Sequence, residues 1–226
     1  MYLLLIIILI ISSILMTEHF SIHNISKLFS HDVNYINIEN YDIQEIPNFL
    51  TDEECNKIIE LTNNKLTPSR IYSDKNDVYL TDSRISNQTW LDDSHPIIKQ
   101  ISDRVRQYTN TVHNHQEPLQ VVNYPVGGFF RPHYDACEGS KEFCKRMDGK
   151  YGPRLFTVLF YLNDNFTGGE TVFPKINKIV SPEKGKAVIF KNVDNNGIII
   201  KQALHGGEPI TSCEKWIANK WIRIGV

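Results

Sequence analysis

The sequence predicts an α+β domain with flanking helices at its N-terminal side and a jelly-roll core, also called a double-stranded β-helix. Two segments before Pro118 show helical periodicity. After Pro118, short runs rich in Val, Ile, Phe and Tyr recur between Gly, Pro and Asn turns. An uncharged apolar segment opens the chain and stands apart from this domain.

Both expected helices have recognisable first turns. "TDEECNKIIELTNN" (51–64) can be capped by Thr51 or Asp52, with acidic residues placed favourably in the first turn. "SHPIIKQISDRVRQYTN" (94–110) carries Pro96 where a helix tolerates proline, and its isoleucines and Val105 recur on one face. We therefore expect two amphipathic helices that pack on the core.

The β-rich part contains at least seven strand-like runs, with no helix expected between them. Such spacing is typical of a sandwich or barrel, and a jelly-roll barrel can hold a small ligand inside. The runs are "LQVVNY" (119–124), "FFRPHYD" (129–135), "RLFTVLFYLN" (154–163), "ETVFP" (170–174), "KAVIFKN" (186–192), "KQALHGG" (201–207) and "KWIANKWIRI" (215–224).

Residues 1–16 form a signal anchor in our interpretation, with a cleaved signal peptide and a secreted product as the alternative. As a helix this segment is about 24 Å long, slightly shorter than a hydrocarbon core. Residues 17–40 are expected to be a linker, and residues 41–226 the folded domain. Either targeting route places the domain in a secretory, ER-like lumen.

The formal net charge is −2, and no Lys/Arg run suggests a nucleic-acid partner.

A candidate metal site lies in "RPHYDACEGSKEFC" (131–144). Side chains at i and i+2 of a strand share a face, so we expect His133 and Asp135 to project together. A distal histidine would complete a two-His, one-carboxylate triad, which suits Fe(II) and leaves coordination positions open. His205 in "QALHGGEP" is the best-placed candidate.

The motifs around these residues resemble the prolyl 4-hydroxylase family of iron(II)- and 2-oxoglutarate-dependent dioxygenases over about residues 41–226. The blocks that carry the resemblance are, in order, "VVNYPVGGFFRPHYD", "RLFTVLFYLN", "GGETVFP", "LHGGEPI" and "KWIANKW". The resemblance implies iron ligation by His133, Asp135 and His205. It also implies hydroxylation of peptidyl proline to 4-hydroxyproline, a reaction that consumes O2 and 2-oxoglutarate and releases succinate and CO2. L-Ascorbate is expected to reduce iron that becomes oxidised in uncoupled turnovers.

The resemblance also implies roles for three residues at the 2-oxoglutarate site. Lys215 matches the lysine that binds the distal carboxylate of 2-oxoglutarate, and a buried carboxylate does need a paired cation. Tyr124 and Thr171 match residues whose hydroxyls contact the same carboxylate.

Further positions match the substrate side of the family. Arg154 matches an arginine of the peptide groove, whereas Arg84, Ser86 and Trp90 match a segment that folds over the substrate. Phe130 stands where the family often carries a tyrosine near the target proline. The alternatives are therefore a 2-oxoglutarate oxygenase that acts on a lysyl residue or a small molecule, or a non-catalytic jelly-roll binding module. The oligomeric state stays open.

The four cysteines leave a zinc site or disulfides as alternatives. Cys137 and Cys144 lack the C-x₂₋₄-C spacing of structural zinc sites, so we expect a local disulfide between them in an oxidising compartment. Cys55 and Cys213 are either buried small residues or a second pair, since four cysteines allow three pairings.

Overall fold

The computed structural model describes residues 41–225, except for 42, 73–77, 80–81 and 113–114. The predicted signal anchor (1–16) and linker (17–40) therefore lie outside the described residues. Within the described part, we find no helix that is both long and apolar enough to cross a membrane.

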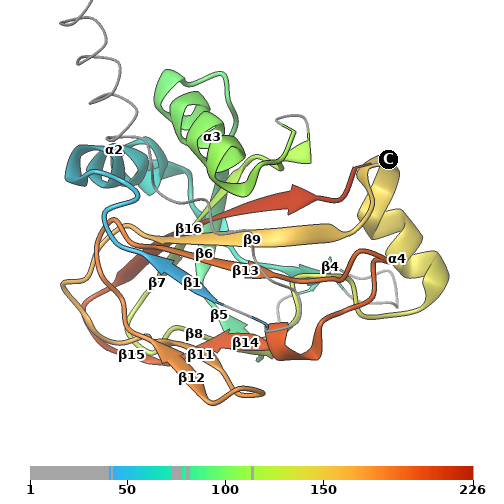
Figure 1. The fold of residues 1–226 in the computed structure, drawn as a ribbon. Helices are drawn as coiled ribbons and strands as arrows, with labels where there is room; N and C mark the ends of the chain where they lie inside the picture. The colour runs from blue at the N-terminus through green and yellow to red at the C-terminus, as the bar shows by residue number, and fades with distance from the viewer. Residues whose placement is uncertain (1–40, 42, 73–77, 80–81, 113–114, 226) are drawn as a thin grey trace, which may run out of the picture. The chain divides into compact units, whose positions relative to one another are not determined.

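Two antiparallel sheets form the body of the domain (Figure 1). The larger sheet has the order β1-β13-β9-β16-β7-β6-β2, and the smaller sheet has the order β12-β11-β14-β8-β5. The larger sheet comprises β1 (Gln44–Ile46), β2 (Thr67–Pro68), β6 (Asn87–Leu91), β7 (Leu119–Tyr124), β9 (Arg154–Tyr161), β13 (Ala187–Lys191) and β16 (Lys215–Arg223). The smaller comprises β5 (Arg84–Ile85), β8 (Phe129–His133), β11 (Thr171–Phe173), β12 (Lys178–Val180) and β14 (His205–Gly207).

Short elements complete the described fold. Two further sheets have two strands each, one formed by β3 and β4 and the other by β10 and β15. Their strands, followed by the 3-10 turns, are β3 (Ile71–Tyr72), β4 (Val78–Tyr79), β10 (Thr167–Gly168), β15 (Ile210–Ser212), η1 (Asn63–Lys65), η3 (Gly149–Tyr151) and η4 (Lys201–Ala203).

Two helices cover the outer face of the larger sheet, α2 (Asp52–Thr62) and α3 (Pro96–Thr109) (Figure 1). Thr51 and Glu54 form a reciprocal capping box at the start of α2. Glu54 also forms a bidentate ion pair with Arg104 of α3, with oxygen–nitrogen distances of 2.7 and 3.0 Å. A partly buried charge pair therefore joins the two helices to each other.

The core between the two sheets is apolar and confirms the predicted jelly roll with N-terminal flanking helices. Alternate residues of the strands point into it, as the pleat requires. The buried cluster consists of Ile43, Val122, Tyr124, Leu159, Tyr161, Phe173, Val180, Val188, Phe190, Ala203, Ile210 and Ile217.

The expectation that no helix interrupts the β-rich part is wrong. Helix α4 (Lys141–Asp148) lies between β8 and β9, and the Ser140 hydroxyl caps it by accepting from the Phe143 N–H (3.3 Å). Phe143 is the residue of α4 that is buried. The segment "KEFCKRMD" is short and mostly polar, so its pattern does not fill a window long enough to reveal a helix.

Candidate functional site

A cavity of about 450 Å³ opens among residues of both sheets and α4. Its wall includes His133 and Asp135 together with His205 and Lys215, which come from two separate parts of the sequence. Strand pairing brings them together: β8 and β14 place His133 opposite His205, and β7 and β16 place Tyr124 opposite Lys215.

Three potential metal ligands converge in this cavity. The Nε2 atom of His133 lies 3.7 Å from Oδ1 of Asp135, and Nε2 of His205 lies 3.7 Å from Oδ2. The ligand atoms of His133, Asp135 and His205 all lie within 4.8 Å of one another. A single ion can therefore contact all three.

The backbone sets the orientation of both imidazoles. Nδ1 of His133 lies 2.9 Å from the carbonyl oxygen of Arg131, and Nδ1 of His205 lies 2.9 Å from that of Ala203. A carbonyl can only accept, so each Nδ1 must carry a proton, and Nε2 is the ring nitrogen available to a metal. Burial, helped by the nearby His133, also lowers the pKa of His205 to about 4, although Asp135 acts against this. His205 is thus neutral at pH 7, the form that binds metals.

Asp135 is held by a chain of buried polar groups. Its Oδ2 atom accepts from the Thr157 hydroxyl (2.6 Å), and Asn192 Nδ2 donates to the same hydroxyl (2.8 Å). Burial opposes ionisation of Asp135, but the groups around it, chiefly His205 and His133, outweigh that effect and hold the pKa of its carboxyl well below the usual range. The carboxylate is therefore charged at neutral pH.

Asp135 does not lie on a strand as expected, because β8 ends at His133. Its carboxylate reaches the site from the segment that follows β8. The strand pattern predicts that the side chains of His133 and Asp135 lie close together, and they do. It also predicts that Asp135 is part of the strand, and this is wrong.

Aromatic rings surround the two histidines. Phe130 stacks on His133 with ring centroids 3.6 Å apart and planes 17° apart. Phe173 and Phe190 lie 5.7 and 4.7 Å from the His205 ring. Phe130 therefore covers one face of His133, and Phe173 and Phe190 pack around the buried His205.

Lys215 provides the buried cation of the cavity. Its side chain is 2% exposed, and Nζ donates to the carbonyl of Gly169 (2.5 Å). Burial lowers the pKa of Lys215 to about 7, although Glu170 acts in the opposite direction. Without a carboxylate beside it, the ammonium group is thus destabilised, and a bound carboxylate would restore its charge.

Tyr124 and Thr171, predicted beside Lys215, also line the cavity. The Lys215 ammonium lies 5.5 Å from the centroid of the Tyr124 ring. The Thr171 hydroxyl is 2.7 Å from the Tyr161 hydroxyl, a partner that the sequence did not suggest. Burial raises the pKa of Tyr124, so its phenol stays protonated and can donate a hydrogen bond.

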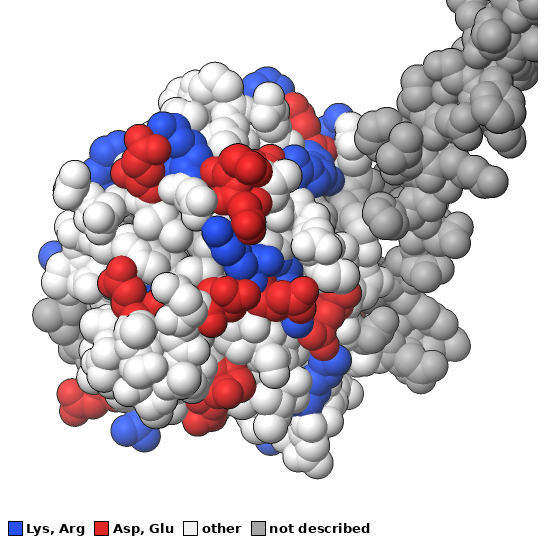
Figure 2. All heavy atoms as spheres, turned by 90° about the vertical axis from the view of Figure 1, so that its left-hand side faces the viewer, with Lys and Arg blue, Asp and Glu red and all other residues white. Residues whose placement is uncertain are grey.

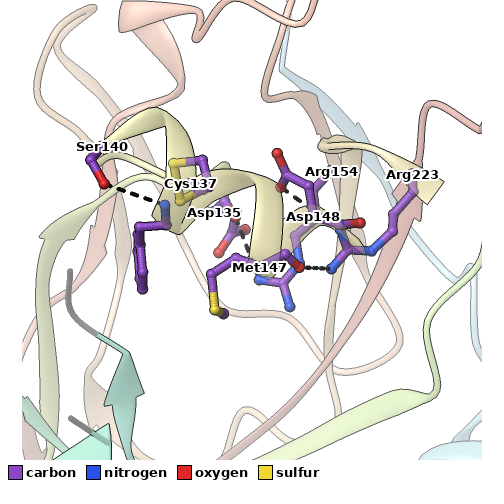
Figure 3. The surroundings of a disulfide bond; sticks show 9 residues. Asp135, Cys137, Ser140, Met147, Asp148, Arg154 and Arg223 are labelled. Carbon is purple, nitrogen blue, oxygen red and sulfur yellow. Dashed lines mark hydrogen bonds and ion pairs between the residues drawn. A yellow bond between two sulfur atoms is a disulfide. The ribbon is translucent and has the colours of Figure 1, made fainter. Parts of the chain in front are cut away.

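Arg154 also lines the cavity, close to Asp148 and Arg223 (Figure 3). It forms a bidentate pair with Glu117 (2.7 and 2.9 Å), and its guanidinium lies 3.5 Å above the Trp221 ring. Arg223 also contacts Glu117 (3.0 Å). Arg154 reaches the backbone carbonyl of Asp135 as well, at 3.5 Å. It therefore supports the loop that carries a metal ligand.

The three residues predicted to fold over the substrate, Arg84, Ser86 and Trp90, differ in where they lie. Arg84 and Trp90 line the cavity. Ser86 does not: its hydroxyl is buried, donates to Ser69 (2.8 Å) and accepts from Arg84 Nε (2.7 Å). Ser86 thus fixes Arg84 and does not face a ligand.

The cysteines form no zinc site among the described residues. Cys137 and Cys144 are joined in a disulfide that ties the loop after Asp135 to α4 (Figure 3). Cys55 is a free buried thiol and Cys213 a free exposed one, so the suggested second pair is wrong.

Sequence reasoning missed Thr157, Asn192, Glu117 and Arg223. One signal was available for Thr157, because it is the polar residue within the apolar run "LFTVLF". A buried polar residue in a strand needs a partner, and here the partner is the potential metal ligand Asp135.

The donor set fits ferrous iron. Two imidazoles and one carboxylate, all oriented by hydrogen bonds before any ion arrives, form a facial triad that leaves coordination positions for other ligands.

Comparison with known proteins agrees with this geometry. Residues 119–223 match the family model of the 2OG-Fe(II) oxygenase superfamily. The chain is 35% identical over 219 residues to a prolyl 4-hydroxylase-like protein of Acanthamoeba polyphaga mimivirus, covering 91% of this chain and 86% of that protein. It is 33% identical to prolyl 4-hydroxylase subunit alpha-2 of Gallus gallus, over 76% of this chain but only 32% of the subunit.

Solved structures give the same result. The viral collagen prolyl hydroxylase of Paramecium Bursaria Chlorella virus-1, solved with 2-oxoglutarate, has a TM-score of 0.65 at 30% identity, over 81% of this chain and 96% of that one. A Trichoplax adhaerens prolyl hydroxylase bound to a hypoxia-inducible-factor peptide shares the fold, with a TM-score of 0.65 at 20% identity, over 90% of this chain and 92% of that one.

Proposed function

Since the chain belongs to the prolyl 4-hydroxylase family of iron(II)- and 2-oxoglutarate-dependent oxygenases, we propose that it converts peptidyl proline to 4-hydroxyproline. The observation that carries this proposal is a single cavity that holds both a two-His, one-carboxylate triad and a buried lysine. The triad provides for the metal, and the lysine provides for the dicarboxylic cosubstrate.

The described residues have distinct tasks in such a reaction. His133, Asp135 and His205 would hold Fe(II) through Nε2, a carboxylate oxygen and Nε2. When bound, iron and 2-oxoglutarate together activate O2 for attack on a C–H bond, with succinate and CO2 as coproducts. The carbonyls of Arg131 and Ala203 accept from Nδ1 and so leave Nε2 of each imidazole as the nitrogen that would bind the metal.

Lys215 would hold the distal carboxylate of 2-oxoglutarate. The cosubstrate's charge would keep the ammonium protonated, and the phenol of Tyr124 can donate a further hydrogen bond. The burial of this end of the cavity strengthens both contacts by excluding water. Arg154 and Trp90 line the rest of the cavity, where a peptide would lie.

The test is to incubate the 226-residue chain with Fe(II), 2-oxoglutarate, ascorbate and proline-rich peptides, and to follow succinate release and peptide mass. Succinate that rises with peptide, together with one added oxygen atom on proline, supports the proposal. His133→Ala and Asp135→Ala should abolish turnover. An iron-loaded protein that hydroxylates none of the peptides would refute the proposal.

We also propose that residues 1–16 anchor the domain to a membrane facing a secretory lumen, and that ascorbate maintains ferrous iron during turnover. The apolar first segment and the Cys137–Cys144 disulfide support the location, because disulfides persist in oxidising compartments. Alkaline extraction of membranes tests the anchor: release of the chain into the supernatant would contradict it. Activity that decays equally fast with and without ascorbate would contradict the second role.

A further inference from the structure

One wall of the cavity carries positive charge that the described protein does not balance. Arg70, Arg84 and Arg131 all line this wall. Arg84 lies opposite Phe130 in the β5–β8 pair, and the backbone N–H of Arg131 donates to the carbonyl of Ser83 (2.8 Å). Pairing of short strands thus gathers guanidinium groups from separate segments.

Arg70 joins this wall through its neighbour Ser69. The N–H of Ser69 donates to the carbonyl of Ser86 (2.9 Å), and the two serine hydroxyls are 2.8 Å apart. Because Ser86 also holds the Arg84 side chain, one buried serine pair fixes Arg84 and the backbone next to Arg70. The cluster is therefore built into the fold.

The contacts of these arginines are neutral. Arg84 donates to the Ser86 hydroxyl and lies 4.6 Å from the centroid of the Phe130 ring. Arg131 makes a long contact to the carbonyl of Asp82 (3.4 Å). Among the residues that the structure describes, no carboxylate forms an ion pair with Arg70, Arg84 or Arg131.

On the opposite wall, carboxylates neutralise the arginines. Arg154 and Arg223 share the carboxylate of Glu117, and Asp148 lies 3.9 Å from Arg223. The asymmetry is local, because the whole chain has a net charge of −2 and acidic and basic groups are intermingled on the face shown in Figure 2. A ligand that crosses the cavity thus meets unbalanced cations along one side.

We propose that the preferred substrate is a proline-containing peptide with an acidic side chain close to the target proline, bound by Arg70, Arg84 and Arg131. This inference rests on the proposed function and adds the charge of the substrate to it. Guanidinium groups pair with carboxylates in a fork geometry, and unpaired cations at a cavity mouth attract anions before contact. Arg84, which is held in place by Ser86, loses little freedom on pairing.

Three fluorescent peptides that differ at a single residue beside the proline, with Glu, Gln or Lys there, test this inference. Binding to the 226-residue chain is measured by anisotropy, and turnover by the mass of the product. The Glu peptide should bind more tightly than the Gln peptide by about two- to five-fold per ion pair formed, with the Lys peptide weakest. The differences should shrink at high salt.

Charge reversal locates the effect. Arg70→Glu and Arg131→Glu, made separately, should narrow or invert the order of the Glu and Lys peptides. Lys65→Glu is the matched control, since Lys65 is exposed and does not line the cavity, and it should leave the order unchanged.

Equal binding of the three peptides, or tighter binding of the Lys peptide, would overturn the inference while leaving the proposed function intact if proline is still hydroxylated. Absence of hydroxylation with all three peptides would count against the proposed function, and the anisotropy order would still decide the charge preference.

Discussion

Thr157 offers a sharp test of how the site is built. Its hydroxyl has one proton, and the Asp135 carboxylate 2.6 Å away can only accept, so Thr157 must donate to it. Thr157 must therefore accept from Asn192, which fixes the orientation of that amide. Thr157→Val removes the donor, keeps the shape of the side chain, and leaves two buried polar groups short of a partner.

The expected effect has two parts. A hydrogen bond to a charged group contributes about 1.5–3 kcal/mol, so the metal-free variant should lose stability of this order in urea unfolding. Partners of metal ligands typically change metal affinity by about 10- to 100-fold, and we expect a loss in this range for Thr157→Val. Co²⁺ titration followed by absorption measures the affinity without any turnover.

Two variants complete the experiment. Thr157→Ser keeps the hydroxyl and should recover most of the Co²⁺ affinity. Thr62→Val removes another buried hydroxyl, one that donates to the carbonyl of Ile58 (2.8 Å) in α2, and should cost stability without changing Co²⁺ affinity. If Thr157→Val bound Co²⁺ as tightly as the unmodified chain, the claim that Thr157 holds the ligand would be refuted.

Three other outcomes are expected. The affinity for 2-oxoglutarate should be full below pH 7 and fall as the pH rises above it, because the pKa of free Lys215 is about 7 and binding requires the protonated form; calorimetry on Fe-free protein that showed a pH-independent Kd would contradict this. Lys215→Met should weaken 2-oxoglutarate binding and leave Co²⁺ affinity nearly unchanged. Reducing the Cys137–Cys144 disulfide, or replacing both cysteines by serine, should lower unfolding stability by about 2–3 kcal/mol, as seen in thermal melts with and without a reductant.

The sequence predicts the elements with strong apolar patterns well. The strand β7 coincides with "LQVVNY", and α2 and α3 begin at their expected caps or first turns. Burial of one side of a helix or strand imposes the pattern, so a pattern of this length can be read without knowing the fold. Helix α4 was not predicted from the sequence because it has no broad apolar face. A disulfide and Phe143 attach it to the domain instead.

Parts of the site needed the third dimension. His133 and Asp135 are close in sequence, whereas the partners of Asp135 come from β9 and from the residue after β13. Nothing local predicts that Thr157 faces a carboxylate, because strand pairing sets this contact. Ser86 is a similar case. The sequence motif predicts that it contacts the substrate, whereas in the structure its hydroxyl binds Arg84 and Ser69.

Each histidine of the triad donates to the carbonyl two residues before it, Arg131 for His133 and Ala203 for His205. Each short segment therefore orients its own imidazole, and the pairing of β8 with β14 sets only the spacing between the two. Damage to the barrel would then move the two ligands apart while each keeps its own Nδ1 contact, so such variants should show altered coordination geometry with both imidazoles still oriented. Loss of metal from a destabilised variant would thus report the separation of two strands.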